Sequence, residues 1–351
     1  MAQKKMLQVL RGEALDTPPI WLMRQAGRYM AEYRAVRAKA GDFLTLCYTP
    51  DYATEVTLQP IRSFGFDASI LFSDILVVPD GLGRKLWFET GEGPRLEPIQ
   101  HESEIAALDI GAMQNKLAPV YETVSRLRAQ LPEDVTLIGF CGAPWTVATY
   151  MIEGGGSKDH VMTRAFAYQN PKAFAHLIDV LVDASVEHLA AQIAAGAEVV
   201  QVFDSWSGAL TSEGFRQWCI EPMAQIATRL RARAPHIPII GFPKGAGTGL
   251  TDYAAGALVD AIGLDTAADL HWVTRNLPAN MPVQGNLDPA LLMSDSDTLL
   301  KAVHNIRSAL RGRPYIFNLG HGIPQTADID LVHLLVDAVR MPFSKLTAKA
   351  A

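Results

Sequence analysis

Two arginines lie four residues apart near the N-terminus, in the segment MRQAGR at 23–28. The guanidinium groups of Arg24 and Arg28 stay charged at any ordinary pH and bind carboxylates through paired hydrogen bonds. The segment stands where an expected strand gives way to an expected helix, and residues four apart share one helix face. The pattern therefore indicates a carboxylate-binding site. A salt-bridged turn, with Glu32 or a distant acid as partner, is the equally weighted alternative.

Asp74 directly follows the apolar run ASILFS at 68–73. A carboxylate at the end of a buried strand is partly removed from water, which disfavours its charged form. Such a group can be a base, a metal ligand or a hydrogen-bond acceptor for N–H groups. Asp is also a common helix N-cap, so a purely structural role has equal weight.

Two further candidates stand beside glycines. His321 in FNLGHGIP has glycine on both sides, so the backbone there can approach a ligand closely. The alternative is a histidine hydrogen-bonded to local backbone. Tyr150 precedes the run Gly154–Gly156, which predicts a phenol beside a mobile flap or, alternatively, a core tyrosine before a flexible loop.

A glycine-rich run, Lys244 to Gly249 (KGAGTG), follows another expected strand. Asp265 lies about twenty residues further on, as in a dinucleotide-binding fingerprint. The glycine spacing is GxGxG rather than GxGxxG, so a nucleotide site is disfavoured. The sequence has no P-loop, HExxH or EF-hand motif and no closely spaced metal ligands, so no metal is expected.

Short β-rich runs alternate with helical stretches along the chain. Several runs are almost continuously apolar, as in parallel strands covered on both faces. About eight alternations favour a single-domain α/β fold over residues 1–351, a (β/α)8 TIM barrel with its site at the C-terminal ends of the strands. The expected strands are 20–25, 68–73, 136–141, 198–203, 238–242, 260–264, 282–286 and 315–319. The residues at their ends are Arg24, Arg28, Asp74, Gly142, Pro144, Tyr150, Asp204, Ser205, Lys244, Asp265, Asn286, Asp288 and His321.

The segments between the strands have helical periodicity. Apolar residues spaced by three and four predict a helix over 172–195, while Pro50 and Gly65 are typical of a helix start and end. The stretch 77–100 contains too much Gly and Pro for a plain helix. It predicts an excursion, such as a hairpin, inserted after the second strand.

The composition excludes several classes of protein. The 351 residues are 49% hydrophobic and 19% charged, as in ordinary globular proteins. The net charge of −6 argues against a nucleic-acid partner. No segment approaches the roughly 18–20 apolar residues of a membrane span. The three cysteines are far apart and no signal-peptide pattern is present, so we expect a reducing, cytoplasmic location.

Taken together, these residues resemble the uroporphyrinogen decarboxylase family of haem biosynthesis. The matching segments follow the family's order across nearly the whole chain, and none departs from its pattern. They are PPIWLMRQAGRY at 18–29, FSDIL at 72–76, GFCGAPWTVATYMIEGGGS at 139–157, VFDS at 202–205 and FNLGHGIP at 317–324.

The resemblance implies a (β/α)8 barrel that forms a homodimer with facing clefts. It implies a tetrapyrrole substrate, uroporphyrinogen III, whose four acetate side chains lose carbon dioxide to give coproporphyrinogen III without metal or organic cofactor. It assigns catalytic roles to Arg24, Asp74 and Tyr150. The residues that it implies for substrate binding are Arg24, Gln25, Ala26, Gly27, Arg28, Asp74, Tyr150, Ser205 and His321.

The chemistry of such a reaction is consistent with these roles. Loss of carbon dioxide from an arylacetate leaves a carbanion unless an electron sink is present, and a pyrrole protonated at a ring carbon is such a sink. An ionised Asp74 at the centre of the macrocycle would stabilise the positive charge where it develops. Arg24 is the family's suggested proton donor, but a guanidinium is a poor acid at neutral pH. Water or a substrate carboxyl is the alternative donor.

Three other functions are alternatives on the residues alone. A related zinc-dependent methyltransferase would need a His/Cys ligand set, which the sequence lacks, and stoichiometric zinc would reveal it. A non-catalytic tetrapyrrole carrier would use the same pocket, and chromatography of products would separate binding from turnover. An enzyme that binds NAD through Lys244–Gly249 would show nicotinamide-dependent absorbance changes.

Overall fold

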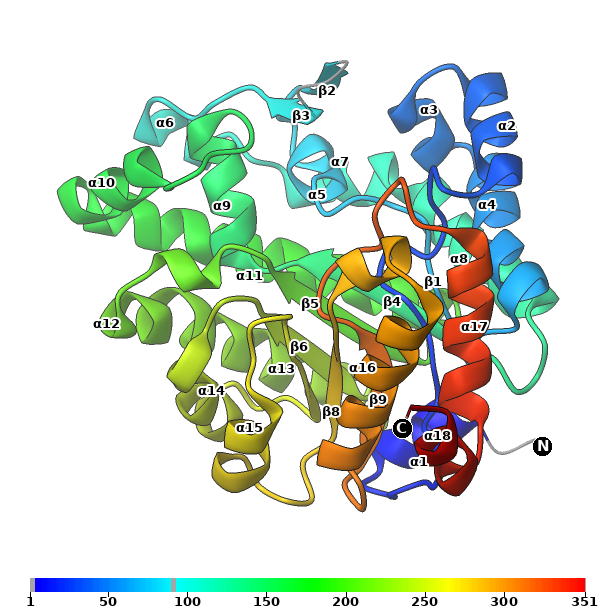
Figure 1. The fold of residues 1–351 in the computed structure, drawn as a ribbon. Helices are drawn as coiled ribbons and strands as arrows, with labels where there is room; N and C mark the ends of the chain where they lie inside the picture. Colours follow the sequence, from blue (N-terminus) through cyan, green and yellow to red (C-terminus); the bar gives the residue numbers. More distant parts are fainter. Residues whose placement is uncertain (1–3, 90–92, 351) are drawn as a thin grey trace.

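The structure, a computed structural model, describes residues 4–89 and 93–350. Within these residues, seven parallel strands form one curled sheet in the order β1-β4-β5-β6-β7-β8-β9 (Figure 1). Seven of the eight expected strands are therefore confirmed. Their bounds are β1 (Ala68–Ile70), β4 (Thr136–Gly142), β5 (Val199–Asp204), β6 (Ile239–Pro243), β7 (Ala261–Gly263), β8 (Val283–Leu287) and β9 (Tyr315–Leu319).

The strands form where the sequence is apolar on both faces. Every residue of β4, β6, β7, β8 and β9 is buried, because one face packs inside the curled sheet and the other against helices. The helices of the outer layer are α4 (Pro50–Phe64), α8 (Ala118–Gln130), α11 (Pro171–Ala195), α13 (Glu221–Arg233), α14 (Leu250–Gly256), α15 (Leu270–Asn276), α16 (Ser296–Ala309) and α17 (Ile329–Arg340).

Two expected helices are confirmed. The stretch 172–195 forms α11, and α4 begins at Pro50 and ends before Gly65. Gly65 has a φ of 64°, a left-handed conformation that glycine adopts without steric cost.

The first expected strand, over 20–25, is wrong beyond its first residue. Ile20 forms an isolated parallel bridge with Phe317 of β9. The N–H of Phe317 donates to the carbonyl of Pro19 at 2.8 Å, and the carbonyl of Ile20 accepts from the N–H of Asp67 at 2.9 Å. The chain therefore passes between β9 and the residue that precedes β1, but it pairs with each of them over only about one residue.

Side chains end this short pairing. The N–H of Met23 donates to the side chain of Asn318 at 2.9 Å, and the N–H of Leu22 donates to the side chain of Gln25 at 3.3 Å. The side chains of Asn318 and Gln25 therefore occupy backbone N–H groups that would pair with a neighbouring strand if this segment continued as a strand. The placement of Arg24 and Arg28 on one helix face is also wrong, since Arg24 has a left-handed φ of 63° and the next helix starts after both.

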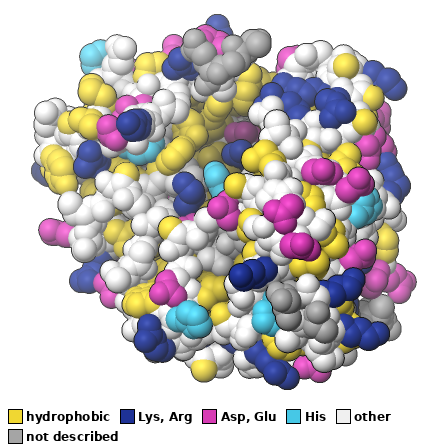
Figure 2. Space-filling model, viewed as in Figure 1, with side chains coloured by type: hydrophobic (Ala, Val, Ile, Leu, Met, Phe, Trp, Pro, Cys, Tyr) yellow, Lys and Arg dark blue, Asp and Glu magenta, His cyan; other side chains and the backbone are white. Residues whose placement is uncertain are grey.

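A second group of elements lies over the C-terminal ends of the strands, at the top of Figure 1. Figure 2 shows a hollow beneath this layer with hydrophobic walls and with charged side chains of both signs in it or at its rim. The elements are α2 (Ala31–Ala40), α3 (Phe43–Tyr48), α5 (Val77–Gly81), β2 (Leu86–Glu89), β3 (Gly93–Leu96), α6 (Glu102–Ala106), α7 (Ile110–Lys116), α9 (Pro144–Glu153) and α10 (Val161–Gln169).

Within the stretch 77–100, α5 is followed by the antiparallel pair of β2 and β3, which joins Leu86 to Leu96 and Glu89 to Gly93. The expected hairpin turn falls at 90–92 and lies outside the described residues. The remaining helices are α1 (Lys5–Leu10) and α18 (Phe343–Ala350), near the two chain ends (Figure 1), and α12 (Ser212–Phe215) after β5. No helix of the described chain is both long and apolar enough to cross a membrane.

Gly320 gives a test of how tightly the strand ends pack. A Cβ atom at this position would clash with the backbone nitrogen of Thr266, which cannot move aside as a flexible side chain could. Gly320→Ala should therefore lower the free energy of unfolding by about 1–3 kcal/mol, measured by urea denaturation. Gly156→Ala is the control, because its Cβ would meet nothing within 4 Å. Equal stabilities of the two variants would contradict the prediction.

Candidate active site

Four of the expected site residues interact electrostatically. The charge of Arg24 lowers the pKa of Asp74, Tyr150 and His321, and the charge of Asp74 raises the pKa of Tyr150. The four side chains come from the segment after Ile20, the end of β1, α9 and the end of β9. Arg24 and His321, almost 300 positions apart in sequence, are therefore brought close together, and Gly322 packs against the side chain of Arg24.

Arg24 and Arg28 form no ion pair with any described residue. Both side chains are exposed, and Glu32 instead accepts a hydrogen bond from Ser63 at 3.0 Å. The salt-bridged turn with Glu32 is therefore absent from the described chain. The two arginines differ in position, because the charge of Arg28 acts on Tyr33 of α2 rather than on Asp74.

The segment between these arginines is fixed by Gln25. Its side chain is buried, accepts from the N–H of Leu22 and donates to the carbonyl of Ala68 in β1 at 3.4 Å. The hydroxyl of Tyr29 donates to the carbonyl of Gln25 at 2.7 Å. The side chain of Gln25 thus ties the loop to the sheet.

Three consecutive backbone amides in this loop have no partner. The N–H groups of Ala26, Gly27 and Arg28 donate to no acceptor among the described residues. Successive free amides form a concave site that favours anions. Together with the two unpaired guanidinium groups, they give the loop the donors that a carboxylate-binding surface needs.

Asp74 is half-buried, and one of its carboxylate oxygens accepts from the N–H of Leu76 at 2.8 Å. The structural alternative from the sequence is therefore partly correct, because Asp74 caps the turn before α5. The second oxygen accepts no hydrogen bond within the described chain. Burial raises the pKa of Asp74, against the opposing effects of the Leu76 N–H and the charge of Arg24. One carboxylate oxygen thus remains available to a ligand.

Tyr150 lies on α9 with its ring centroid 6.3 Å from that of Trp206. Burial and the charge of Asp74 raise the pKa of the phenol, while the nearby Trp206 indole and Arg24 oppose that rise. The phenol is therefore protonated at neutral pH and can donate a hydrogen bond into the cavity.

His321 is neutral at neutral pH. Burial and the positive charges of Arg24 and Lys244 lower its pKa to about 4, against the charge of Asp265. Its ring makes no hydrogen bond to a described residue, which argues against a histidine satisfied by local backbone. A Cβ atom at Gly322 would clash with the side chain of Arg24, so glycine there permits the close packing of this strand end on the arginine.

Ser205 and Asp204 follow β5 but differ in their surroundings. Ser205 is half-buried, and its hydroxyl has no partner in the described chain. Asp204 is buried, which raises its pKa to about 6, although hydrogen bonds from Cys219 and Thr146 favour its charged form. The Thr146 hydroxyl donates to Asp204 at 2.6 Å and accepts from the N–H of Trp206 at 3.2 Å. Asp204 thus supports Trp206, which lies against Tyr150.

Comparison with known proteins decides what kind of site this is. The family model of uroporphyrinogen decarboxylase (URO-D) matches residues 1–341. The chain belongs to the uroporphyrinogen decarboxylase family. A uroporphyrinogen decarboxylase from Chelativorans sp. (strain BNC1) is 55% identical over 340 residues, 97% of this chain and 99% of the relative. Another, from Novosphingobium aromaticivorans, is 51% identical and covers 95% of this chain and 98% of its own.

A solved structure of low sequence identity shows the same fold. A methyltransferase from Methanosarcina mazei superimposes with a TM-score of 0.80 over 96% of this chain and 98% of its own, at 18% identity. At that identity the similarity concerns the fold alone. In the part of the chain that the structure describes, no group of three or more His, Cys, Asp or Glu side chains is placed to hold a metal ion.

Three acidic or amide residues at strand ends serve the fold instead of the cavity. Asp265 accepts from the N–H groups of Gly245 at 2.5 Å and Ala267 at 2.8 Å. Asn286 donates to the carbonyl of Asp265 at 2.9 Å, and Asp288 caps the turn that follows β8. The acid expected to bind a ribose in the dinucleotide alternative is therefore engaged by the glycine run itself.

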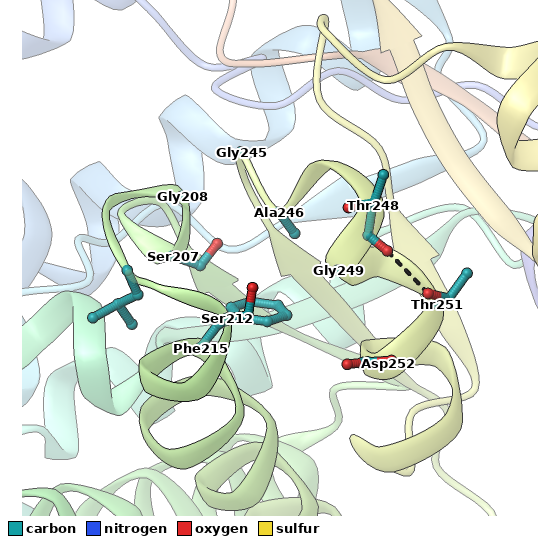
Figure 3. A pocket seen from close by; sticks show the side chains of 11 residues that line it. Ser207, Gly208, Ser212, Phe215, Gly245, Ala246, Thr248, Gly249, Thr251 and Asp252 are labelled. Atoms are coloured by element: carbon teal, nitrogen blue, oxygen red, sulfur yellow. Dashed lines mark hydrogen bonds between the residues drawn. The ribbon is translucent and has the colours of Figure 1, made fainter.

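The glycine run also borders a separate cavity of about 350 Å³, shown in Figure 3. It lies between the loops after β5 and β6 and is lined by Ser207, Gly208, Leu210, Ser212, Phe215, Gly245, Ala246, Thr248, Gly249, Thr251 and Asp252. Two of its polar side chains have partners: Thr251 donates to the carbonyl of Thr248, and Asp252 pairs with Arg216 at 3.2 Å. None of the expected site residues lines this cavity.

Sequence reasoning missed Trp206 and Thr146 as parts of the site. Trp206 directly follows VFDS, so an aromatic residue after a strand end was a usable signal. Thr146 gave none, because its role depends on a hydrogen bond across 58 sequence positions to Asp204.

The buried Asp204 predicts a pH dependence of stability. Its pKa is about 6 in the folded chain against an ordinary value of 3.8, so between these values the folded state binds a proton that the unfolded state has lost. Stability must then fall as pH rises through this window, by on the order of 3 kcal/mol in total. Asp204→Asn keeps an acceptor for Thr146 but cannot titrate. Urea denaturation from pH 4 to 7 should show wild type losing stability relative to the variant, and parallel curves would contradict this.

Proposed function

We propose that this chain decarboxylates the four acetate side chains of uroporphyrinogen III to methyl groups, giving coproporphyrinogen III in tetrapyrrole biosynthesis. Relatives named uroporphyrinogen decarboxylase, 49–55% identical over 97% of the chain, support the activity. The structural observation that carries it is the free carboxylate oxygen of Asp74 in the same cavity as the unpaired Arg24. An anionic acceptor beside a free cation suits a substrate with N–H groups at its centre and carboxylates around it.

Asp74 has the central role in this proposal. Its free oxygen accepts hydrogen bonds from the pyrrole N–H groups, and its negative charge stabilises the pyrrole that becomes cationic when protonated at a ring carbon. That protonated ring takes up the electron pair left when carbon dioxide departs. A proton then adds to the side-chain carbon, which becomes a methyl group, and the ring carbon releases the proton that it first took up, so that the pyrrole is restored and one proton is consumed in place of each carbon dioxide.

The other site residues bind and orient the carboxylates. Arg24, Arg28 and the free amides at 26–28 neutralise them and hold the reacting acetate over the ring. The phenol of Tyr150 and the hydroxyl of Ser205 donate hydrogen bonds, and neutral His321 offers one donor and one acceptor. The reaction in this form uses no metal or organic cofactor.

We also propose the finer architecture. Residues 19–21 complete a (β/α)8 barrel, with support from their hydrogen bonds to Phe317 and Asp67 on either side. Residues 1–351 then form a single domain with the stretch 77–100 inserted after β1. We place the protein in the cytoplasm as a homodimer, as the resemblance to the family implies.

The direct test of activity is anaerobic incubation of the protein with uroporphyrinogen III, followed by chromatography of the oxidised products. Coproporphyrin, with intermediates of seven to five carboxylates at early times, is expected. Unchanged substrate that co-purifies with the protein would indicate a carrier instead.

Asp74→Asn tests the electrostatic role. The variant keeps the shape and the acceptor for Leu76 but loses the negative charge, so kcat should fall by about 100-fold or more. The melting temperature should not fall, because no ion pair is broken in the described chain. Near-normal turnover by a folded variant would refute the role.

Arg24→Ala and Arg28→Ala test carboxylate recognition. Each variant lacks one unpaired guanidinium group, so each should bind the eight-carboxylate substrate roughly ten-fold more weakly than wild type does. Binding of the later, partly decarboxylated intermediates should be weakened less. Apparent KM values for the successive intermediates measure the difference. Arg11→Ala, on the surface beside Glu13, is the control, and equal effects on all intermediates would argue against recognition.

A further inference from the structure

Lys244 stands at the end of β6 with its backbone anchored on the neighbouring strand end. Its N–H donates to the carbonyl of Asp204 at 3.0 Å. Its carbonyl accepts from the hydroxyl of Ser207 at 2.8 Å and from the N–H of Gly208 at 3.1 Å. Three hydrogen bonds therefore fix the point from which the side chain extends.

The ammonium group of Lys244 is half-buried and has no counter-ion. No carboxylate of the described chain lies within 4 Å of it, and it donates no hydrogen bond there. Its recorded contact is with the ring of Trp206, 5.6 Å from the centroid. A cation–π contact offsets only part of the cost of removing a charge from water. Asp265, whose two oxygens accept the N–H groups of Gly245 and Ala267, forms no ion pair with Lys244 in the described chain.

The position of this charge differs from that of Arg24. Lys244 and Arg24 both act on His321, but only Arg24 acts on Asp74 and Tyr150. The ammonium group of Lys244 lies over the ring of Trp206, whose centroid is 6.3 Å from that of Tyr150, so Lys244 reaches the site from the side of Trp206. The ammonium group of Lys244 would therefore contact the periphery of a ligand whose centre is bound by Asp74.

We propose that Lys244 binds a peripheral side-chain carboxylate of the substrate beside Trp206, apart from the loop that carries Arg24 and Arg28. The inference rests on the proposed function. Because this contact lies away from the reacting ring, it stabilises the bound substrate and the transition state equally. Loss of such a contact raises KM and leaves kcat largely unchanged.

The test compares Lys244→Met with Lys244→Arg. Met keeps the length and the apolar contact with Trp206 but removes the charge, so KM for uroporphyrinogen should rise about ten-fold with kcat within about two-fold. Arg restores the charge and should return KM most of the way to the wild-type value. Lys301→Met, on the exposed surface of α16, is the matched control and should leave both parameters unchanged.

A binding measurement separates this inference from the proposed function. The dissociation constant of coproporphyrinogen, measured under anaerobic reducing conditions, should rise about as much as KM in Lys244→Met. Wild-type KM and wild-type affinity in a folded Lys244→Met variant would overturn the role of Lys244, as would a fall in kcat with KM unchanged. Failure of wild type to decarboxylate uroporphyrinogen would instead overturn the proposed function, and the binding arm would still decide whether Lys244 holds a tetrapyrrole carboxylate. If Lys244→Met does not fold, Lys244→Gln serves in both arms.

Discussion

The site depends on two opposite charges that share a cavity without neutralising each other. Arg24 is near enough to lower the pKa of Asp74, yet the two form no ion pair in the described chain. A direct pair would satisfy both groups and leave little for a ligand. Because the two charges are held apart, Asp74 can still accept hydrogen bonds from N–H groups at the centre of a macrocycle. Arg24 can still bind a carboxylate beside it.

Keeping Arg24 in that position requires a strained backbone. A left-handed φ of 63° at a residue other than glycine costs about 1–2 kcal/mol. The buried side chain of Gln25 and the acceptor of Asn318 hold the adjoining residues, and Gly322 leaves room for the arginine side chain. The same hydrogen bonds that end the pairing at Ile20 therefore shape the loop that binds carboxylates in the proposed function. In that proposal the interruption of the sheet is part of the site.

This interruption also marks the limit of prediction from the sequence. Continuous apolar runs identify β4 to β9 because a strand that is buried on both faces needs apolar residues at nearly every position. The segment 20–25 has a similar composition, but its conformation is set by Asn318, almost 300 residues away. The residue types of the candidate site were recognisable, and the charge of Arg24 does act on Asp74, Tyr150 and His321. Their mutual support, such as Asp204 acting through Thr146 on Trp206, depends on non-local hydrogen bonds that no spacing encodes.

The charge of the cavity is opposite to the charge of the chain. The protein as a whole has a net charge of −6, yet three unpaired cations, Arg24, Arg28 and Lys244, serve the ligand in the proposed function. In the free protein two of them lower the pKa of His321. Substrate carboxylates would neutralise those same two charges, while burial, the largest cause of the low pKa of His321, would remain. His321 therefore stays a neutral hydrogen-bonding group in the proposed complex, and the binding of the carboxylates falls to the three cations.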